Sequence, residues 1–144
     1  MIDEDAITSY ITTTFVGVET AVQMGYTFFF YRDDHMLPFA TLISEDNEYD
    51  RYSNLNRPGV FRLNVGVSRE TFESFFGPGK VDVSGYDFSA LDTFMPHPEY
   101  APQSFICILN PSDETYLRLK EFLKEAYEIA VRRYNRRTRT SPGL

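Results

Sequence analysis

The sequence predicts an α+β domain: an antiparallel sheet of about five strands, with an N-terminal helix and a long C-terminal helix packed on one face. Three observations predict this fold class. Four strand-like segments follow one another within residues 19–67 with no helical pattern between them, which favours antiparallel neighbours. Residues 60–67 alternate between apolar and polar side chains, as a strand with one buried face does. The last third of the chain carries an apolar stripe at helical spacing.

The first helix is expected over residues 4–15. Asp3 or Asp5 can cap its N-terminus, and the acidic residues at its start suit the positive end of the helix dipole. Gly17 is expected to follow its last turn, because glycine commonly ends a helix.

The first four strands are expected at residues 19–24, 27–32, 37–44 and 60–67. Gly25-Tyr26 is predicted to form the tight turn of a hairpin between the first two strands. The polar residues 45–59 are predicted to form a loop. In the fourth strand, the core face is expected to carry Phe61, Leu63, Val65 and Val67, and the other face Arg62, Asn64 and Gly66.

A short helix is expected near residues 69–76, directly after the fourth strand. Ser68 can cap it, and Gly77-Pro78-Gly79 would end it. A fifth strand is then expected at residues 103–110.

The long C-terminal helix completes the order of elements. Ser112 or Asp113 can cap it, and its apolar stripe continues to at least Tyr134. A chain of 144 residues is expected to form one domain, residues 1–144, in which residues 135–144 are a basic tail.

Charge is unevenly distributed along the chain, whose net charge is −7. Residues 1–111 hold six Lys and Arg against sixteen Asp and Glu, whereas residues 112–144 hold eight against five. An acidic body repels nucleic acids and anionic membranes, so only the basic end could attract them.

The single cysteine and the N-terminus bear on the compartment. Cys107 excludes an intramolecular disulfide, and its apolar neighbours predict a buried side chain. The acidic N-terminus lacks the uninterrupted apolar segment of a signal peptide, and no apolar run is long enough to cross a bilayer. A cytoplasmic protein without membrane partners is therefore expected.

The segment Tyr86–Pro111 is the most informative part of the chain. It combines one of the two histidines and four of the eight prolines with many aromatic residues. Its residues 86–102 are expected to form an ordered loop across one face of the domain, where binding sites usually lie, and to lead into the fifth strand. If this loop covers the polar face of the fourth strand, a ligand-binding pocket would contain Arg62, Asn64, Tyr86, His97 and Tyr100. If that face is open to water, Arg62 and Asn64 are ordinary surface residues.

No complete catalytic or phosphate-binding motif is present. We therefore expect a non-catalytic module, monomeric or homodimeric, that binds an unknown ligand or protein without a cofactor. An enzyme with His97 as acid or base is an alternative, since imidazole titrates near neutral pH and Glu99 or Asp92 could orient it. Otherwise, His97 would hold the loop by hydrogen-bonding a backbone carbonyl.

A metal site is a weaker hypothesis. His35 follows Asp33 and Asp34, and these residues could bind a metal with Asp46 and Glu48 if the two loops met. A solvated hairpin turn is the favoured interpretation, so no metal is expected.

A nucleic-acid partner is the second alternative. The basic patch consists of Arg132, Arg133, Arg136, Arg137 and Arg139. These side chains could contact phosphates, and binding would then weaken steeply with salt and disappear when the chain is cut after Arg133. The favoured interpretation is a solvated helix end whose cations suit the negative pole of the dipole and pair with the acidic body.

The closing unit PHPEYAPQSFICILNPSDETYLRLKEFLKEAYEIAVRR resembles that of the MmcQ/YjbR-like proteins. There a turn with proline and histidine leads to a strand, an acidic cap and a long helix. The corresponding residues here are His97, Tyr100, Phe105 to Leu109, Asp113 and Ala126-Tyr127. The resemblance implies an α+β fold of a type suspected of binding DNA.

Almost the whole chain is similar to a family of uncharacterised bacterial proteins that is common in actinobacteria. The similarity rests on FFFY, LPFATLIS, RPGVFRLNVGVSRETF, YDFSALDTFMPHPEYAPQ and ILNP. It implies a family identity and carries no assigned activity.

Overall fold

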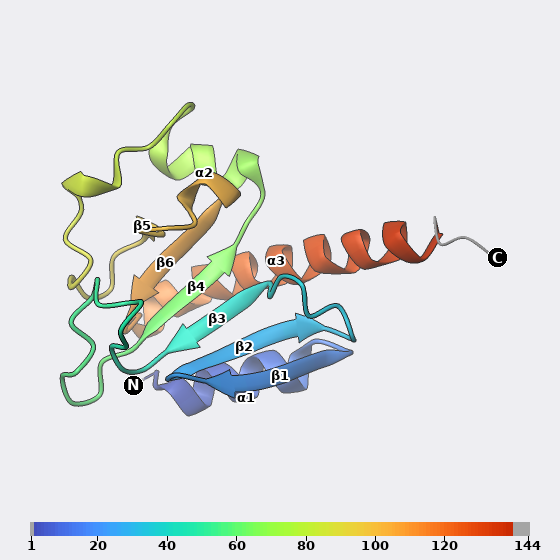
Figure 1. Ribbon diagram of the computed structural model, residues 1–144, viewed down its shortest axis with the longest axis horizontal. Helices are drawn as coiled ribbons and strands as arrows, with labels where there is room; N and C mark the ends of the chain where they lie inside the picture. The colour runs from blue at the N-terminus through green and yellow to red at the C-terminus, as the bar shows by residue number, and fades with distance from the viewer. Residues whose placement is uncertain (1, 140–144) are drawn as a thin grey trace.

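The computed structural model describes residues 2–139, in which six strands form one antiparallel sheet (Figure 1). The strands are β1 (Val18–Gln23), β2 (Tyr26–Tyr31), β3 (Ala40–Ile43), β4 (Arg62–Gly66), β5 (Met95–Pro96) and β6 (Phe105–Leu109). Their order across the sheet is β1-β2-β3-β4-β6-β5. The predicted count of about five omits β5, because a strand of two residues is too short to produce an alternating pattern.

The helices are α1 (Glu4–Thr14), α2 (Arg69–Phe76) and α3 (Asp113–Arg139), with 3₁₀ turns at Val83–Gly85 and Ala101–Gln103. Helices α1 and α3 cover the same face of the sheet, which confirms the predicted α+β fold class (Figure 1). Within residues 2–139, no helix is both long and apolar enough to cross a lipid bilayer.

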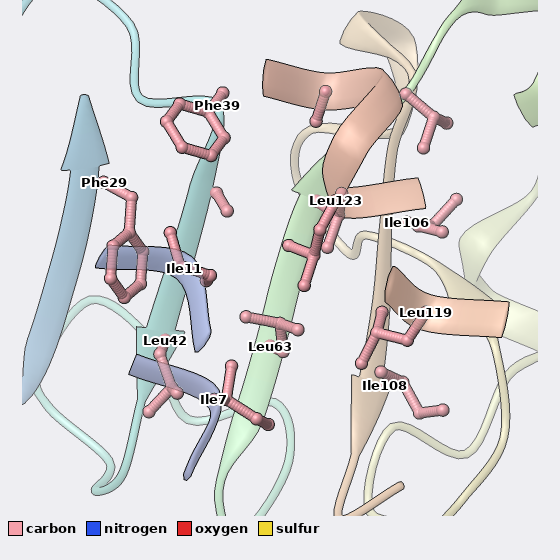
Figure 2. Close-up of a cluster of buried hydrophobic side chains, with 14 of the residues drawn as sticks. Ile7, Ile11, Phe29, Phe39, Leu42, Leu63, Ile106, Ile108, Leu119 and Leu123 are labelled. Atoms are coloured by element: carbon pink, nitrogen blue, oxygen red, sulfur yellow. The ribbon is translucent and has the colours of Figure 1, made fainter. Parts of the chain in front are cut away.

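The main core lies between these two helices and the sheet. Figure 2 shows Ile7 and Ile11 of α1 and Leu119 and Leu123 of α3 directed at the same sheet face, where Leu63 is fully buried. The alternation in β4 therefore places its apolar side chains against the helices, as predicted.

Side-chain caps fix where the three helices begin. Asp3, Ser68 and Ser112 each accept a hydrogen bond from the backbone N–H three residues later, at 2.8, 3.1 and 3.1 Å. These bonds satisfy N–H groups that have no partner inside the helix, and they agree with the predicted caps.

Helix α3 is longer than its apolar stripe indicated. It continues past Tyr134 to Arg139, so the part of the predicted basic tail at residues 135–139 is helical. Residues 140–144, the remainder of that tail, lie outside the described residues.

The turn of the first hairpin was predicted one residue too late. Gln23 pairs with Tyr26, so Met24-Gly25 forms the turn and Tyr26 belongs to β2. Both turn residues have positive φ, 55° for Met24 and 82° for Gly25, as a type I′ turn requires. Methionine rarely adopts this conformation, so the sequence favoured the wrong pair.

Three strands are shorter than predicted. Pro38 precedes β3, which begins only at Ala40. At the start of β4, the Phe61 N–H donates to the Asn110 side chain at 3.1 Å and not to a neighbouring strand. Before β6, residues 101–103 form a 3₁₀ turn.

The opposite sheet face carries a second, smaller apolar cluster. Its buried members are Ile43, Leu55, Val60, Met95, Cys107 and Leu109, with Tyr26, Tyr86 and Phe88 packed against them. The loop that precedes β4 and the loop that follows α2 therefore cover part of this face. Burial raises the pKa of the Cys107 thiol to about 12, so the thiol stays protonated and unreactive.

Candidate ligand-binding site

A cavity of about 530 Å³ lies on the sheet face opposite α1 and α3. Its floor consists of side chains from the four central strands, namely Tyr26, Phe28, Thr41, Asn64 and Phe105. Residues 36–38 and 49–50, with His97, Glu99 and Tyr100, form much of its wall. Most of this lining is aromatic or aliphatic, which is typical of pockets for small molecules.

Arg62 lies fully buried beside this cavity, on the same face of β4 as Asn64. Its guanidinium binds Asp50 through two bonds, Nη1 to Oδ1 at 3.1 Å and Nη2 to Oδ2 at 2.5 Å. Nη1 also donates to Ser53 Oγ at 3.0 Å, and Nε donates to Asn64 Oδ1 at 2.9 Å. The buried cation is therefore both paired and hydrogen-bonded, as burial in a protein requires.

The polar network extends from this pair into the cavity floor. Asn64 Nδ2 donates to Thr41 Oγ1 at 2.9 Å, and the Tyr26 hydroxyl donates to the Asp50 carboxylate. Burial alone would raise the pKa of Asp50, but the hydrogen bonds and charge of Arg62 hold that pKa below its ordinary value. The side chains of Asp50 and Arg62 are thus both charged, and their charges neutralise each other.

His97 stands at the wall of the cavity with 3% of its surface exposed. Its Nδ1 accepts the backbone N–H groups of Glu99 and Tyr100, each at 3.0 Å. The proton of the neutral ring is therefore on Nε2. Burial, and then the nearby Arg62 charge, lower the pKa of His97 to about 3, so the ring is neutral at physiological pH.

The Nε2–H of His97 is a donor without a protein acceptor in the described part of the chain. Within residues 2–139, every fully buried side-chain nitrogen and oxygen has a hydrogen-bond partner. Nε2 is thus not fully buried, and His97 is one of the residues that line the cavity. The site therefore offers the His97 Nε2–H as a hydrogen-bond donor whose orientation is fixed by the bonds to Nδ1.

Two predictions about His97 were wrong: that Glu99 or Asp92 orients its ring, and that the ring bonds a backbone carbonyl. Neither carboxylate orients the ring, because Glu99 accepts a hydrogen bond from the Tyr52 hydroxyl and Asp92 accepts one from the Ser112 N–H, both at 2.9 Å. His97 does hold its loop, but Nδ1 accepts from two N–H groups and does not donate to a carbonyl.

The five predicted ligand-binding residues occupy different places. Asn64, His97 and Tyr100 line the cavity, and Arg62 lies behind it through its bonds to Asp50 and Asn64. Tyr86 does not line this cavity. It packs in the second apolar cluster, against Phe88 and Phe76.

Sequence reasoning missed Asp50, Ser53, Thr41 and Tyr26 as members of the polar network. One signal was available, because an arginine on the covered face of a strand needs an acidic partner. The loop at residues 45–59 holds four acidic residues, and the sequence offers no way to choose Asp50 among them.

The proposed metal ligands do not meet. His35 Nε2 lies 2.9 Å from Glu19 Oε1, and its ring stacks on Phe30 at 4.3 Å. Among the described residues, no three His, Cys, Asp or Glu side chains form a group that could hold a metal ion.

Two of the five C-terminal arginines anchor α3 to the turn after β2. Arg133 donates to Asp34 Oδ2 at 3.4 Å and to the Leu37 carbonyl at 3.1 Å, and Arg137 lies 2.8 Å from Asp34 Oδ1. Burial alone would raise the pKa of Asp34, but chiefly Arg133 lowers it. A nucleic-acid role for Arg132, Arg136 and Arg139 stays a prediction.

Replacing Asp34 by asparagine is expected to lower the free energy of unfolding by about 1–2 kcal/mol, because both arginines lose their charged acceptor. Chemical unfolding followed by circular dichroism measures this change. Asp33→Asn is the matched control, since Asp33 is exposed on the same turn, and it should change stability little. Equal effects of the two substitutions would contradict the anchoring role.

Residues 2–139 match a protein family described as a family of unknown function, DUF6194. No curated protein and no solved structure matches the chain. The resemblance of the closing unit to MmcQ/YjbR-like proteins therefore stays a prediction. The match includes every described strand and helix, the cavity and its polar network, and the chain belongs to the DUF6194 family.

Proposed function

We propose that this protein is a non-catalytic module that binds a small, uncharged and largely apolar molecule in the cavity over β2, β3 and β4. One observation carries the proposal. The His97 ring is almost completely buried and lines a cavity of about 530 Å³, and its Nε2–H, which is not fully buried, has no acceptor among the described residues. A ligand that carries an acceptor atom would give this donor a hydrogen-bond partner inside the cavity.

The remaining lining favours a ligand with an apolar body and disfavours an anion. Phe28, Phe105 and Tyr26 offer aromatic surface for an apolar body. The charge of Arg62 is already cancelled by Asp50, so it offers an anion no free partner. The Glu99 carboxylate lines the same cavity and repels anions further.

The rim of the cavity also favours an apolar partner. Met36, Leu37, Tyr49 and Tyr100 line the cavity, yet each is more than 40% exposed. Large apolar side chains gathered around one opening are typical of binding sites. They would lose contact with water when a ligand enters, and this burial would stabilise the complex.

The geometry disfavours the enzymatic alternative. A general base works best with a pKa near the working pH, whereas burial lowers the pKa of His97 to about 3. The Nδ1 lone pair is also occupied by two backbone N–H groups. His97 is therefore suited to donate a hydrogen bond and is poorly suited to carry a proton.

Three monosubstituted benzenes of similar size test the proposal: acetophenone with a carbonyl acceptor, ethylbenzene without one, and benzoate with a negative charge. Each is titrated into the uniformly ¹⁵N-labelled protein, and amide shifts are followed. We expect acetophenone to bind about two- to tenfold more tightly than ethylbenzene, the contribution of one hydrogen bond, and benzoate to bind most weakly. The shifts should concentrate around Thr41, Asn64 and Tyr100.

Two variants complete this test. His97→Asn retains an acceptor for the N–H groups of Glu99 and Tyr100 but lacks a donor at the Nε2 position, so it should bind acetophenone and ethylbenzene equally. His35→Asn alters the other histidine, which lies outside the cavity lining, and should behave as the native chain does. The absence of saturable shifts with all three probes would overturn the proposal. Equal binding of acetophenone and ethylbenzene to the native chain would remove the role of His97.

A further inference from the structure

Strand β1 is an open edge of the sheet. It pairs only with β2, and no strand in residues 2–139 covers its other side (Figure 1). Five of its six residues are exposed, and Val22 is 76% exposed. The strand contains no proline or lysine and has a single charged residue, Glu19. Natural edge strands usually carry such protective residues, and an unprotected edge is a template for pairing with another strand.

The backbone groups that face outward can be identified. The Arg32 N–H donates to the Gly17 carbonyl at 2.7 Å, and the register pairs Val18 with Tyr31. In an antiparallel ladder, hydrogen-bonded and non-bonded pairs alternate. Gly17 and every second residue after it therefore bond to β2, and the N–H and C=O groups of Val18, Thr20 and Val22 point away from the sheet.

We propose that two copies of the chain associate through β1, in an antiparallel register centred on Thr20. Thr20 would pair with the partner's Thr20, and Val18 with the partner's Val22. This register brings all outward groups of the strand opposite outward groups of the partner, which gives about six backbone hydrogen bonds. The two sheets would join into one continuous sheet across the dimer axis.

The side chains agree with this register. Val18 and Val22 lie on one face of the strand. Val18 of each copy would lie opposite Val22 of the other copy, and such pairs of β-branched residues are favourable. On the opposite face, Glu19 would lie across from the partner's Ala21 and only diagonally from the partner's Glu19. A register centred on Ala21 would leave only about four backbone bonds, and one centred on Glu19 would place like charges directly opposite each other.

Cysteine trapping tests the register. Paired residues in a hydrogen-bonded position have Cα atoms about 5.5 Å apart, within the range for a disulfide, whereas two copies of residue 21 would lie about 8 Å apart. We expect mild oxidation to link Thr20→Cys into dimers and to leave Ala21→Cys monomeric. The native chain is the control, because its single Cys107 is buried. Faster linkage of Ala21→Cys would overturn the proposed register.

Sedimentation equilibrium tests the association itself. We expect the native chain to dimerise with a Kd no weaker than about 1 mM. Thr20→Pro removes an N–H that makes no bond to β2, so it should preserve the fold by circular dichroism and weaken dimerisation about tenfold or more. Thr20→Val keeps the N–H and should dimerise as the native chain does. A native chain that stays monomeric, or a Thr20→Pro variant that is folded and dimerises normally, would overturn the proposal.

Discussion

Replacing Arg62 by methionine is expected to lower the free energy of unfolding by about 3–5 kcal/mol. Methionine fills much of the space of the arginine stem, so the effect comes mainly from the missing guanidinium. Asp50, only 3% exposed, would remain as a buried carboxylate, and among residues 2–139 its one other side-chain donor is the Tyr26 hydroxyl. Urea unfolding at neutral pH, followed by circular dichroism, measures the change.

A second substitution separates the loss of charge pairing from the loss of packing. In Arg62→Met combined with Asp50→Asn both charges are gone, so the double variant should be more stable than Arg62→Met alone by about 1–3 kcal/mol. Arg51→Met is the matched control, since Arg51 is exposed and its side chain bonds, within the described part of the chain, only the Asn47 carbonyl. If Arg62→Met costs less than about 1 kcal/mol, the pair does not stabilise the loop over the sheet.

Acidification is expected to destabilise the protein through His97. Burial lowers its folded-state pKa to about 3, whereas an unfolded histidine titrates near 6.5. Between these values the unfolded chain binds a proton that the folded chain excludes. The stabilising contribution is therefore complete above about pH 6.5 and is lost as pH falls, at about 1.4 kcal/mol per pH unit, until about pH 3.

The measurement is a series of urea unfolding curves between pH 7 and pH 4.5, where His97 should contribute a loss of about 2–3 kcal/mol. At pH 4.5 an unfolded aspartate, whose ordinary pKa is about 3.9, is still mostly ionised, so Asp34 and Asp50, whose folded-state pKa values are lowered, add little to this loss. His97→Asn should flatten the dependence, and His35→Asn should retain it. A native chain equally stable at both limits would show that His97 is not held neutral.

The fold was largely predictable because it rests on local periodicity. The alternation around Leu63 and the stripe through Leu119 and Leu123 report directly which face of each element is buried. The remaining errors have local physical causes. Met24 adopts a positive φ that methionine rarely takes, and β5 is too short to leave a pattern.

The candidate site was predictable only in part. The aromatic, proline-rich segment and the polar face of β4 indicated where it lies, and they supplied Asn64, His97 and Tyr100. The partner of Arg62 could not be chosen, since pairing between a loop and a strand depends on loop conformation. Asp92 shows the same limit, because it caps the start of α3 and does not contact the histidine.

The anchor between α3 and the turn after β2 links two distant regions of the molecule. Arg133 and Arg137 hold Asp34, and Arg133 also holds the carbonyl of Leu37, whose side chain belongs to the mouth of the cavity. The turn after β2, which forms part of the cavity wall, is thus held in place by the C-terminal part of α3. Removing the last two turns of α3 would free this part of the cavity wall and, under the proposed function, would change the rate at which a ligand enters.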